Sequence, residues 1–383
     1  MTVRNLRAVA TALLLGAAAM AGATVLSSTP AAAALRASVG KPLLEAQTLY
    51  SQGNYKAAMA KVNEAEAVSG KTAEETNVIN QMKNFIAVSS GDASIGGAAG
   101  AKAKFANDYN AGKYRDVIAD ADTLKKYNAF GPQEQLLVGQ AYYKANDFAG
   151  CVRYTKTLSG SDTALELMAR CAYEVGDEAT QRVALEQLVA RGGKPEHWKL
   201  LLKLGERARG LSDHNTLDIN RLRLITGSMG GKDDYISLVQ FALQFKMGAE
   251  AQATMEKGVA AKVLTDDRSM RLLANAKATA AANQADRAKD LAAANASPQG
   301  DGGTGLVDIG ERMIGEGKAK EAIAMIQTGM KKQLKDPNNA QIRLGQAYLA
   351  AGQKAEAKAA FAKVKTPEKD AMVAHLWFLA ASH

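Results

Sequence analysis

Apolar residues recur every three or four positions along most of the chain, in stretches that are interrupted by glycine or asparagine. The clearest case is residues 341–365, where apolar and small side chains keep this spacing on both sides of Gly352. Such a period places apolar residues on one face of an α-helix, and a glycine readily adopts the left-handed conformation that ends a helix. The pattern predicts two helices joined by a turn at Gly352, and Pro367 then ends the unit.

The same helix–turn–helix pattern recurs along the chain. Residues 137–158 carry it around Asn146, and four looser copies centre on other glycines. These glycines are Gly53, Gly112, Gly176 and Gly317. Gly112 and Asn146 are 34 residues apart, and Gly317 and Gly352 are 35 residues apart. A period near 34 predicts an array of stacked helical hairpins and not a set of unrelated domains.

The strongest copy resembles the tetratricopeptide repeat. Its residues at that family's signature positions are Leu344, Gly345, Tyr348, Gly352, Ala357 and Phe361. The copy around Asn146 matches at Gly139, Tyr142, Asn146, Phe148 and Cys151. Gly345 and Ala357 leave room where two helices cross, and Tyr348 and Phe361 fill the space beside them. The resemblance implies an all-α fold, a right-handed α-solenoid of helix–turn–helix repeats like those of the tetratricopeptide family.

The repeats divide the chain into two predicted arrays. The first covers residues 35–296, and within it residues 195–264 form degenerate repeats, because helix signals continue there while the signature fades. The glycine-rich residues 297–305 are predicted to be a linker. Residues 306–383 form the second array, which ends in a capping helix that carries Trp377.

Residues 1–34 are predicted to be an export signal. Arg4 and Arg7 form a basic start, and the stretch Ala8–Val25 is apolar and uncharged. Small residues then precede a cleavage site near Ala34, so we expect a periplasmic protein. The alternative is an uncleaved membrane anchor, since the stretch is about long enough to span a bilayer.

Composition and charge narrow the partner class only slightly. With 47% apolar and 23% charged residues, the chain can bury a core. Its formal charge of +9 falls to +7 without Arg4 and Arg7, and acidic residues are interleaved with the basic ones. Because no nucleic-acid-binding motif is present, we expect no nucleic acid partner.

No arrangement of residues predicts catalysis, a cofactor or a metal site. The histidines have neither HExxH spacing nor a zinc-type cysteine partner; they are His197, His214, His375 and His383. Gly227–Lys232 faintly resembles a phosphate-binding loop, but Asp233 stands where serine or threonine is needed. Glu166 and Glu196 are the nearest candidates for the acid of a glycosidase, and each is better interpreted as a solvated helix residue. The sequence therefore predicts that the protein is not an enzyme.

Cys151 and Cys171, the only cysteines, leave two alternatives open. In an oxidising compartment they would form a disulfide that closes about 20 residues and stabilises the fold by roughly 3 kcal/mol. Otherwise they are two separate buried thiols, which behave as small apolar side chains.

The resemblance also implies where a partner binds. In this family the first helix of each repeat lines a concave surface, and one position there holds Tyr50, Tyr109, Tyr143 and Tyr173. The same reasoning adds Gln47, Gln140, Lys144 and Arg170 to this surface. Tyrosine combines a large apolar ring with a polar tip and is favoured at protein interfaces. The alternative is that these tyrosines only pack between helices.

The sequence predicts a periplasmic scaffold that binds a protein partner of the bacterial cell envelope. The alternative function is an accessory protein that binds peptidoglycan or another glycan through its tyrosines. We expect the protein itself to lie at the membrane surface only if its signal stays uncleaved.

Overall fold

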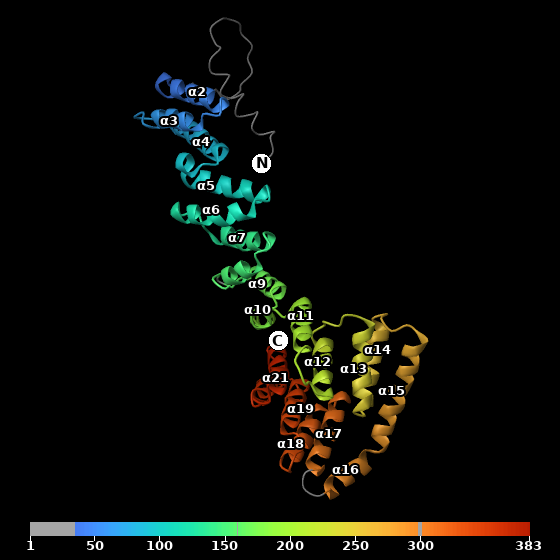
Figure 1. Ribbon diagram of the computed structural model, residues 1–383. Coiled ribbons are helices and arrows are strands. Elements are labelled where there is room, and N and C mark those ends of the chain that lie inside the picture. The colour runs from blue at the N-terminus through green and yellow to red at the C-terminus, as the bar shows by residue number, and fades with distance from the viewer. Residues whose placement is uncertain (1–34, 159, 298–300) are drawn as a thin grey trace. The chain divides into compact units, whose positions relative to one another are not determined.

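The structure is a computed structural model that describes residues 35–158, 160–297 and 301–383. Within these residues the chain forms twenty helices, α2 to α21, in close succession (Figure 1). The all-α fold of helix–turn–helix repeats predicted from the sequence is confirmed. The chain divides into two compact units, Met1–Tyr154 and Thr155–His383, which we call unit 1 and unit 2.

Unit 1 contains α2 (Ala37–Ser51), α3 (Tyr55–Glu66), α4 (Ala73–Ser90), α5 (Ala93–Asn110), α6 (Tyr114–Lys126), α7 (Pro132–Lys144) and nearly all of α8 (Phe148–Thr155). Unit 2 contains α9 (Asp162–Glu174), α10 (Glu178–Arg191), α11 (Pro195–Gly205), α12 (Asp213–Ile225), α13 (Lys232–Gln244), α14 (Gly248–Ala260), α15 (Asp267–Ala285), α16 (Arg287–Ala296), α17 (Asp301–Gly315), α18 (Ala319–Met330), α19 (Pro337–Ala350), α20 (Lys354–Phe361) and α21 (Glu368–Ala380).

The predicted export signal, residues 1–34, lies outside the described residues. In the part of the chain that the structure describes, no helix is long and apolar enough to cross a membrane.

Seven of the three-residue turns between consecutive helices share one geometry. Each contains a residue of positive φ, and the residue after it donates its N–H to the carbonyl five positions earlier, over 2.7–3.0 Å. The positive-φ residues are Gly53, Gly112, Asn146, Gly176, Lys246, Gly317 and Gly352. Such a bond satisfies a carbonyl that the end of a helix would otherwise leave without a partner. Six of these turns are the predicted ones, and the seventh, at Lys246 between α13 and α14, lies where the signature fades.

Unit 1 has two apolar clusters, one among α2 to α4 and one among α5 to α8. Leu43 and Ile79 belong to the first, and Phe105 and Leu124 to the second. Helix α5 contributes to both because it bends at Gly97, whose φ of 55° and ψ of −133° break the helical path. Glycine adopts this conformation without a steric penalty.

The C-terminal helices are not a separate array, which corrects the predicted division of the chain. In unit 2 one apolar cluster joins Trp198 and Ile219 from the middle of the chain to Phe361 and Trp377 near its end. Helix α21 packs against α10 and α12 as well as α19 and α20, so it fills the unit and does not cap a free end (Figure 1). Burial of these large side chains outweighs the sequence separation.

The predicted linker is also corrected, because helix α17 begins at Asp301 within it. A β-carbon on Gly303 would lie 2.6 Å from the carbonyl oxygen of Gln333, and one on Gly302 would overlap the carbonyl of Ala294. These glycines are therefore required by close helix packing. Composition alone cannot distinguish such a stretch from a flexible one.

Candidate partner-binding surfaces

The four predicted tyrosines occupy one position of the shared turn. The carbonyl of each accepts a hydrogen bond from the N–H of the positive-φ residue three positions later, over 2.9–3.1 Å. In the other three turns of this geometry the position holds Leu243, Ile314 and Leu349. The equivalence that the sequence suggested is therefore real, although its side chain changes from aromatic to aliphatic along the chain.

That equivalence settles the fold of the chain. Seven turns with one hydrogen-bond pattern each join two helices that pack together, α7 and α8 through the rings of Tyr142 and Tyr154. The chain has a tetratricopeptide-like repeat fold.

Three of the predicted residues meet in unit 1 of this repeat protein. The hydroxyl of Tyr109 on α5 donates to Oε1 of Gln140 on α7 over 2.8 Å. The Tyr109 ring meets the ring of Tyr114 edge to face with centroids 5.8 Å apart, and Nζ of Lys144 lies 5.6 Å from the Tyr114 centroid. We call these four residues the Tyr109 cluster. Tyr109, Tyr114 and Gln140 are only partly buried and Lys144 is exposed, so a partner can reach the cluster.

Tyr50 packs elsewhere in unit 1. Its ring centroid lies 4.6 Å from that of Phe85 and 5.6 Å from that of Tyr55, and its hydroxyl is 3.1 Å from Oγ of Ser89. Gln47 on the same helix is half-buried. Tyr50 thus packs on neighbouring rings while part of its surface stays accessible, and its role in binding stays a prediction.

The remaining predicted residues do not join the Tyr109 cluster. Tyr143 is half-buried, with its ring centroid 5.3 Å from that of Phe148. Tyr173 and Arg170 belong to unit 2, where Tyr173 is 56% exposed and Arg170 is exposed. Tyr173 is thus the most accessible tyrosine of the predicted set.

The charges beside the Tyr109 cluster are largely compensated. Nζ of Lys104 lies 2.7 Å from Oδ2 of Asp108 and 2.6 Å from Oδ1 of Asp120. Burial acts to lower the pKa of Lys104, but these two carboxylates outweigh it and raise the pKa. The cluster is therefore suited to hydrogen bonding and ring contact more than to long-range attraction.

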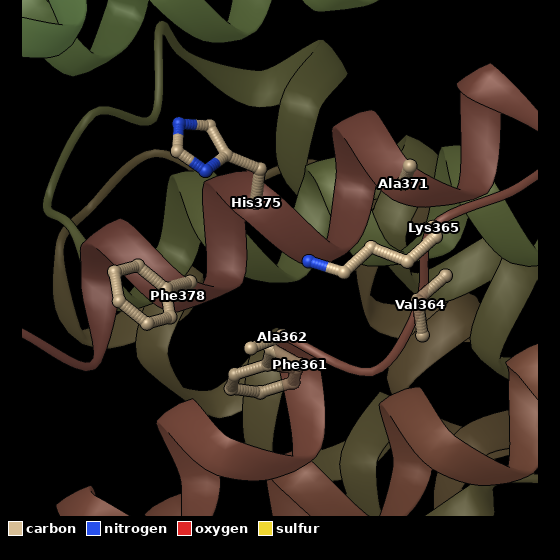
Figure 2. Close-up of a pocket in the computed structure, with 7 residues that line it drawn as sticks. All are labelled: Phe361, Ala362, Val364, Lys365, Ala371, His375 and Phe378. Atoms are coloured by element: carbon tan, nitrogen blue, oxygen red, sulfur yellow. The ribbon is translucent and has the colours of Figure 1, made fainter.

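Unit 2 has an apolar pocket of about 340 Å³ between α20 and α21. It is lined by Phe361, Ala362, Val364, Lys365, Ala371, His375 and Phe378. Figure 2 shows the Lys365 side chain extended between the two helices, with Phe361 and Phe378 beside the space. The sequence analysis missed this pocket. One feature of the sequence could have indicated the pocket. Trp377 and Phe378 are consecutive, so they lie on different faces of their helix, and Trp377 is the one that is buried.

The residues weighed for catalysis do not form a reaction centre. Glu166 is exposed and its Oε1 lies 3.0 Å from Nε2 of His197, while Glu196 is exposed in the first turn of α11. Lys232 of the glycine-rich turn lies 2.6 Å from Asp266. No group of histidine, cysteine or acidic residues in the described part of the chain is arranged to hold a metal ion.

Cys151 and Cys171 are both disulfide-bonded and both fully buried. The described residues contain no free cysteine.

Comparisons with known proteins return only distant similarity to solved structures. No protein-family model and no curated protein matches the chain. Among solved structures, 85% of this chain aligns with 52% of a chain in "Structure of Naa15/Naa10 bound to HypK-THB", at 12% identity and a TM-score of 0.32. In "Crystal structure of APC/C hetero-tetramer Cut9-Hcn1", 65% of a chain aligns with 84% of this chain, at 12% identity and a TM-score of 0.24. For a tetratricopeptide repeat protein from Parabacteroides merdae, 99% of that chain aligns with 89% of this chain, at 10% identity and a TM-score of 0.19.

The chain spans about half the length of the first of these proteins. TM-scores this low carry no inference about partners or activity. The assignment of the fold to the tetratricopeptide type depends on the turns and helix pairs of this repeat protein itself.

Proposed function

We propose that the protein is an exported, non-catalytic scaffold that binds a segment of another cell-envelope protein. The observation that carries the proposal is the Tyr109 cluster, which joins side chains of α5, α6 and α7 on an accessible surface. Aromatic rings with polar tips supply much contact area for little conformational entropy, and they are enriched where binding energy is concentrated.

The expected occupant is an extended or helical peptide segment. Tyr109 and Gln140 together offer hydroxyl and amide groups to a backbone, and the Tyr114 ring under Lys144 offers an apolar face. Since Lys104 is already paired, we expect the contact to depend weakly on salt.

The cellular location is a separate part of the proposal and is tested first. Residues 1–34 have the pattern of an export signal. Osmotic-shock fractionation should release a shortened protein that begins near Leu35. A full-length protein that stays with the membranes would instead support the uncleaved anchor.

The partner is sought by crosslinking in cells followed by mass spectrometry. The test variant combines Tyr109→Phe with Gln140→Ala, because the first removes only a hydroxyl and preserves ring packing. Ile225→Ala in α12, where the side chain is 54% exposed, is the control for truncation of a surface residue. We expect a specific envelope protein to be crosslinked in the wild type and the control, and lost in the test variant.

The other outcomes separate the remaining hypotheses. A wild-type protein without any crosslinked partner contradicts the scaffold proposal. Cosedimentation with purified sacculi that is lost in the test variant would support glycan binding by the same surface.

A further inference from the structure

Unit 2 contains a second, larger cavity of about 520 Å³ that is distinct from the apolar pocket of Figure 2. Its wall is built by α12, the turn between α13 and α14, α16 and α17. The side chains that matter here are His214, Phe245, Asp290, Asp308, Glu311 and Arg312. The volume lies within the range of sites for small ligands or for one large side chain.

Acidic groups outnumber guanidinium groups in and behind this wall. The carboxylates are Asp218, Glu250, Asp290, Asp308 and Glu311. The guanidinium groups are Arg221, Arg312 and Arg343. Two exposed lysines are nearby, Lys246 on the wall and Lys335 close to Asp308. With these lysines the basic groups also number five, so what matters is which carboxylate lacks an ion pair.

Asp308 is the carboxylate of this set that has no ion pair within the described chain. Asp290 lies 2.8 Å from Arg312, and Glu311 lies 2.7 Å from Arg221 and 2.8 Å from Arg343. Asp308 is an exposed residue that forms no hydrogen bond or ion pair within the described chain. Protein atoms around the carboxylate desolvate it in part and, with help from Glu311, raise the pKa of Asp308 to about 6.

Two polar atoms of the wall also lack partners among the described residues. Glu311 is only 2% exposed and uses Oε1 for both arginines, which leaves Oε2 without a hydrogen bond. Nδ1 of His214 is buried without a partner as well. Buried polar atoms are seldom left unsatisfied, and each such atom indicates a missing water, ion or ligand.

An aromatic pair completes the wall. The rings of His214 and Phe245 are stacked with centroids 4.0 Å apart and planes inclined by 19°. Burial, with a contribution from Arg343, lowers the pKa of His214, so this ring is neutral near pH 7. A neutral aromatic face beside carboxylates favours an organic cation, which can stack on the ring and pair with the acid.

We propose that this cavity binds the side chain of an arginine or lysine from the partner protein. The stacked rings beside the carboxylates suit an organic cation, and an arginine or lysine side chain carries one. That the bound side chain comes from a protein partner rests on the proposed scaffold function. That the cavity binds an organic cation does not rest on it, so the scaffold function and the cation site can be disproved separately.

The test uses purified full-length protein and three probes. The first is an end-blocked pentapeptide with arginine between glycines, and the second carries citrulline, a neutral isostere, in its place. The third is agmatine, a free amine with a guanidinium group. Binding is measured by calorimetry at pH 7.5 and pH 5.

We expect the arginine peptide to bind at pH 7.5 and the citrulline peptide to bind roughly tenfold to hundredfold more weakly, as for loss of a charge-assisted hydrogen bond. Affinity for the arginine peptide should fall toward pH 5, because Asp308 then takes up a proton. Protonation of His214 adds a positive charge and would act in the same direction.

Asp308→Asn should weaken binding of the arginine peptide and remove most of the pH dependence. The same variant should be about as stable as the wild type, because Asp308 is exposed and makes no hydrogen bond or ion pair within the described chain. The matched control is Asp233→Asn, at an exposed carboxylate in the first turn of α13 of the same unit. Loss of binding with retained stability distinguishes a ligand contact from a structural role.

Three results would overturn the inference. Equal affinity for the arginine and citrulline peptides excludes recognition of charge, and unchanged affinity in Asp308→Asn excludes this cavity. Binding of agmatine without binding of the arginine peptide excludes a protein side chain as the ligand. Failure to find a crosslinked partner, by contrast, leaves all of these measurements possible and tests only the scaffold proposal.

Discussion

Arg343 of α19 and Asp218 of α12, 125 residues apart in the chain, form a two-point ion pair in which both side chains are at least 99% buried. Arg343 also lies 2.8 Å from Glu311 of α17. Burial acts to raise the pKa of Asp218, but Arg343 and Arg221 outweigh it and lower the pKa. The pair ties the C-terminal helices to the middle of unit 2.

Replacing Arg343 by methionine should therefore destabilise unit 2 strongly. Asp218 and Glu311 would remain buried with less compensation, and removal of one partner of a buried pair costs about 3–5 kcal/mol. Urea unfolding followed by circular dichroism measures the loss. Arg191→Met is the control, because Arg191 and Asp162 are both exposed and such a pair contributes less than about 1 kcal/mol. Similar losses for both variants would contradict the importance of burial.

Gly345→Ala tests the helix crossing that the sequence predicted. A β-carbon there would overlap the ring of Phe361, which is 1% exposed and cannot move aside easily. We expect a loss of about 1–3 kcal/mol in the free energy of unfolding. Gly192→Ala, with nothing within 4 Å of the added carbon, should change it by less than about 0.5 kcal/mol. A neutral Gly345→Ala would show that the helices separate readily.

The turn at Lys246 explains why the repeat signature fades in this part of the chain. The φ of Lys246 is 56°, positive like that of the glycines in the other turns. Lysine, however, gives no turn signal in a sequence. Lys246→Gly should stabilise the protein by about 1 kcal/mol, since a side chain in this conformation is strained. Thermal unfolding checks this, with Gly352→Ala expected to shift the midpoint the opposite way. A lower midpoint for Lys246→Gly would mean that its side chain matters more than its backbone.

Other features could not be found in the sequence for a different physical reason. Turns and helix crossings depend on residues within one hairpin, so Gly345 and Phe361, which are 16 positions apart, could both be assigned to the crossing in advance. The pairing of Asp218 with Arg343 and the cavity beside Glu311 depend on helices that are distant in the chain. The tyrosines show both cases, because their place in the turn was predictable while their neighbours were not.

Glu75 should make unit 1 sensitive to acid. Its carboxylate accepts hydrogen bonds from Arg36 and from the N–H of Thr72. These partners lower the pKa of Glu75 from 4.5 to about 2, and Arg36 makes the larger contribution. Because the folded-state pKa is the lower one, the stabilisation is fully present above pH 4.5 and is lost as the pH falls toward 2. Glu75→Gln should lower the unfolding midpoint at pH 7 and bring it close to the wild type at pH 2. A constant difference at both pH values would contradict this.

The two cysteines allow a chemical test of the oxidised state. Since both are disulfide-bonded and fully buried, unfolding in urea without a reductant should expose no thiol to maleimide, and unfolding with a reductant should expose two. If the two are bonded to each other across about 20 residues, the double variant Cys151→Ser, Cys171→Ser should lose roughly 3 kcal/mol of stability. Reduction of the wild type should cause a similar loss. Labelling of two thiols without reductant, in protein prepared from the periplasm, would instead identify the cysteines as buried thiols.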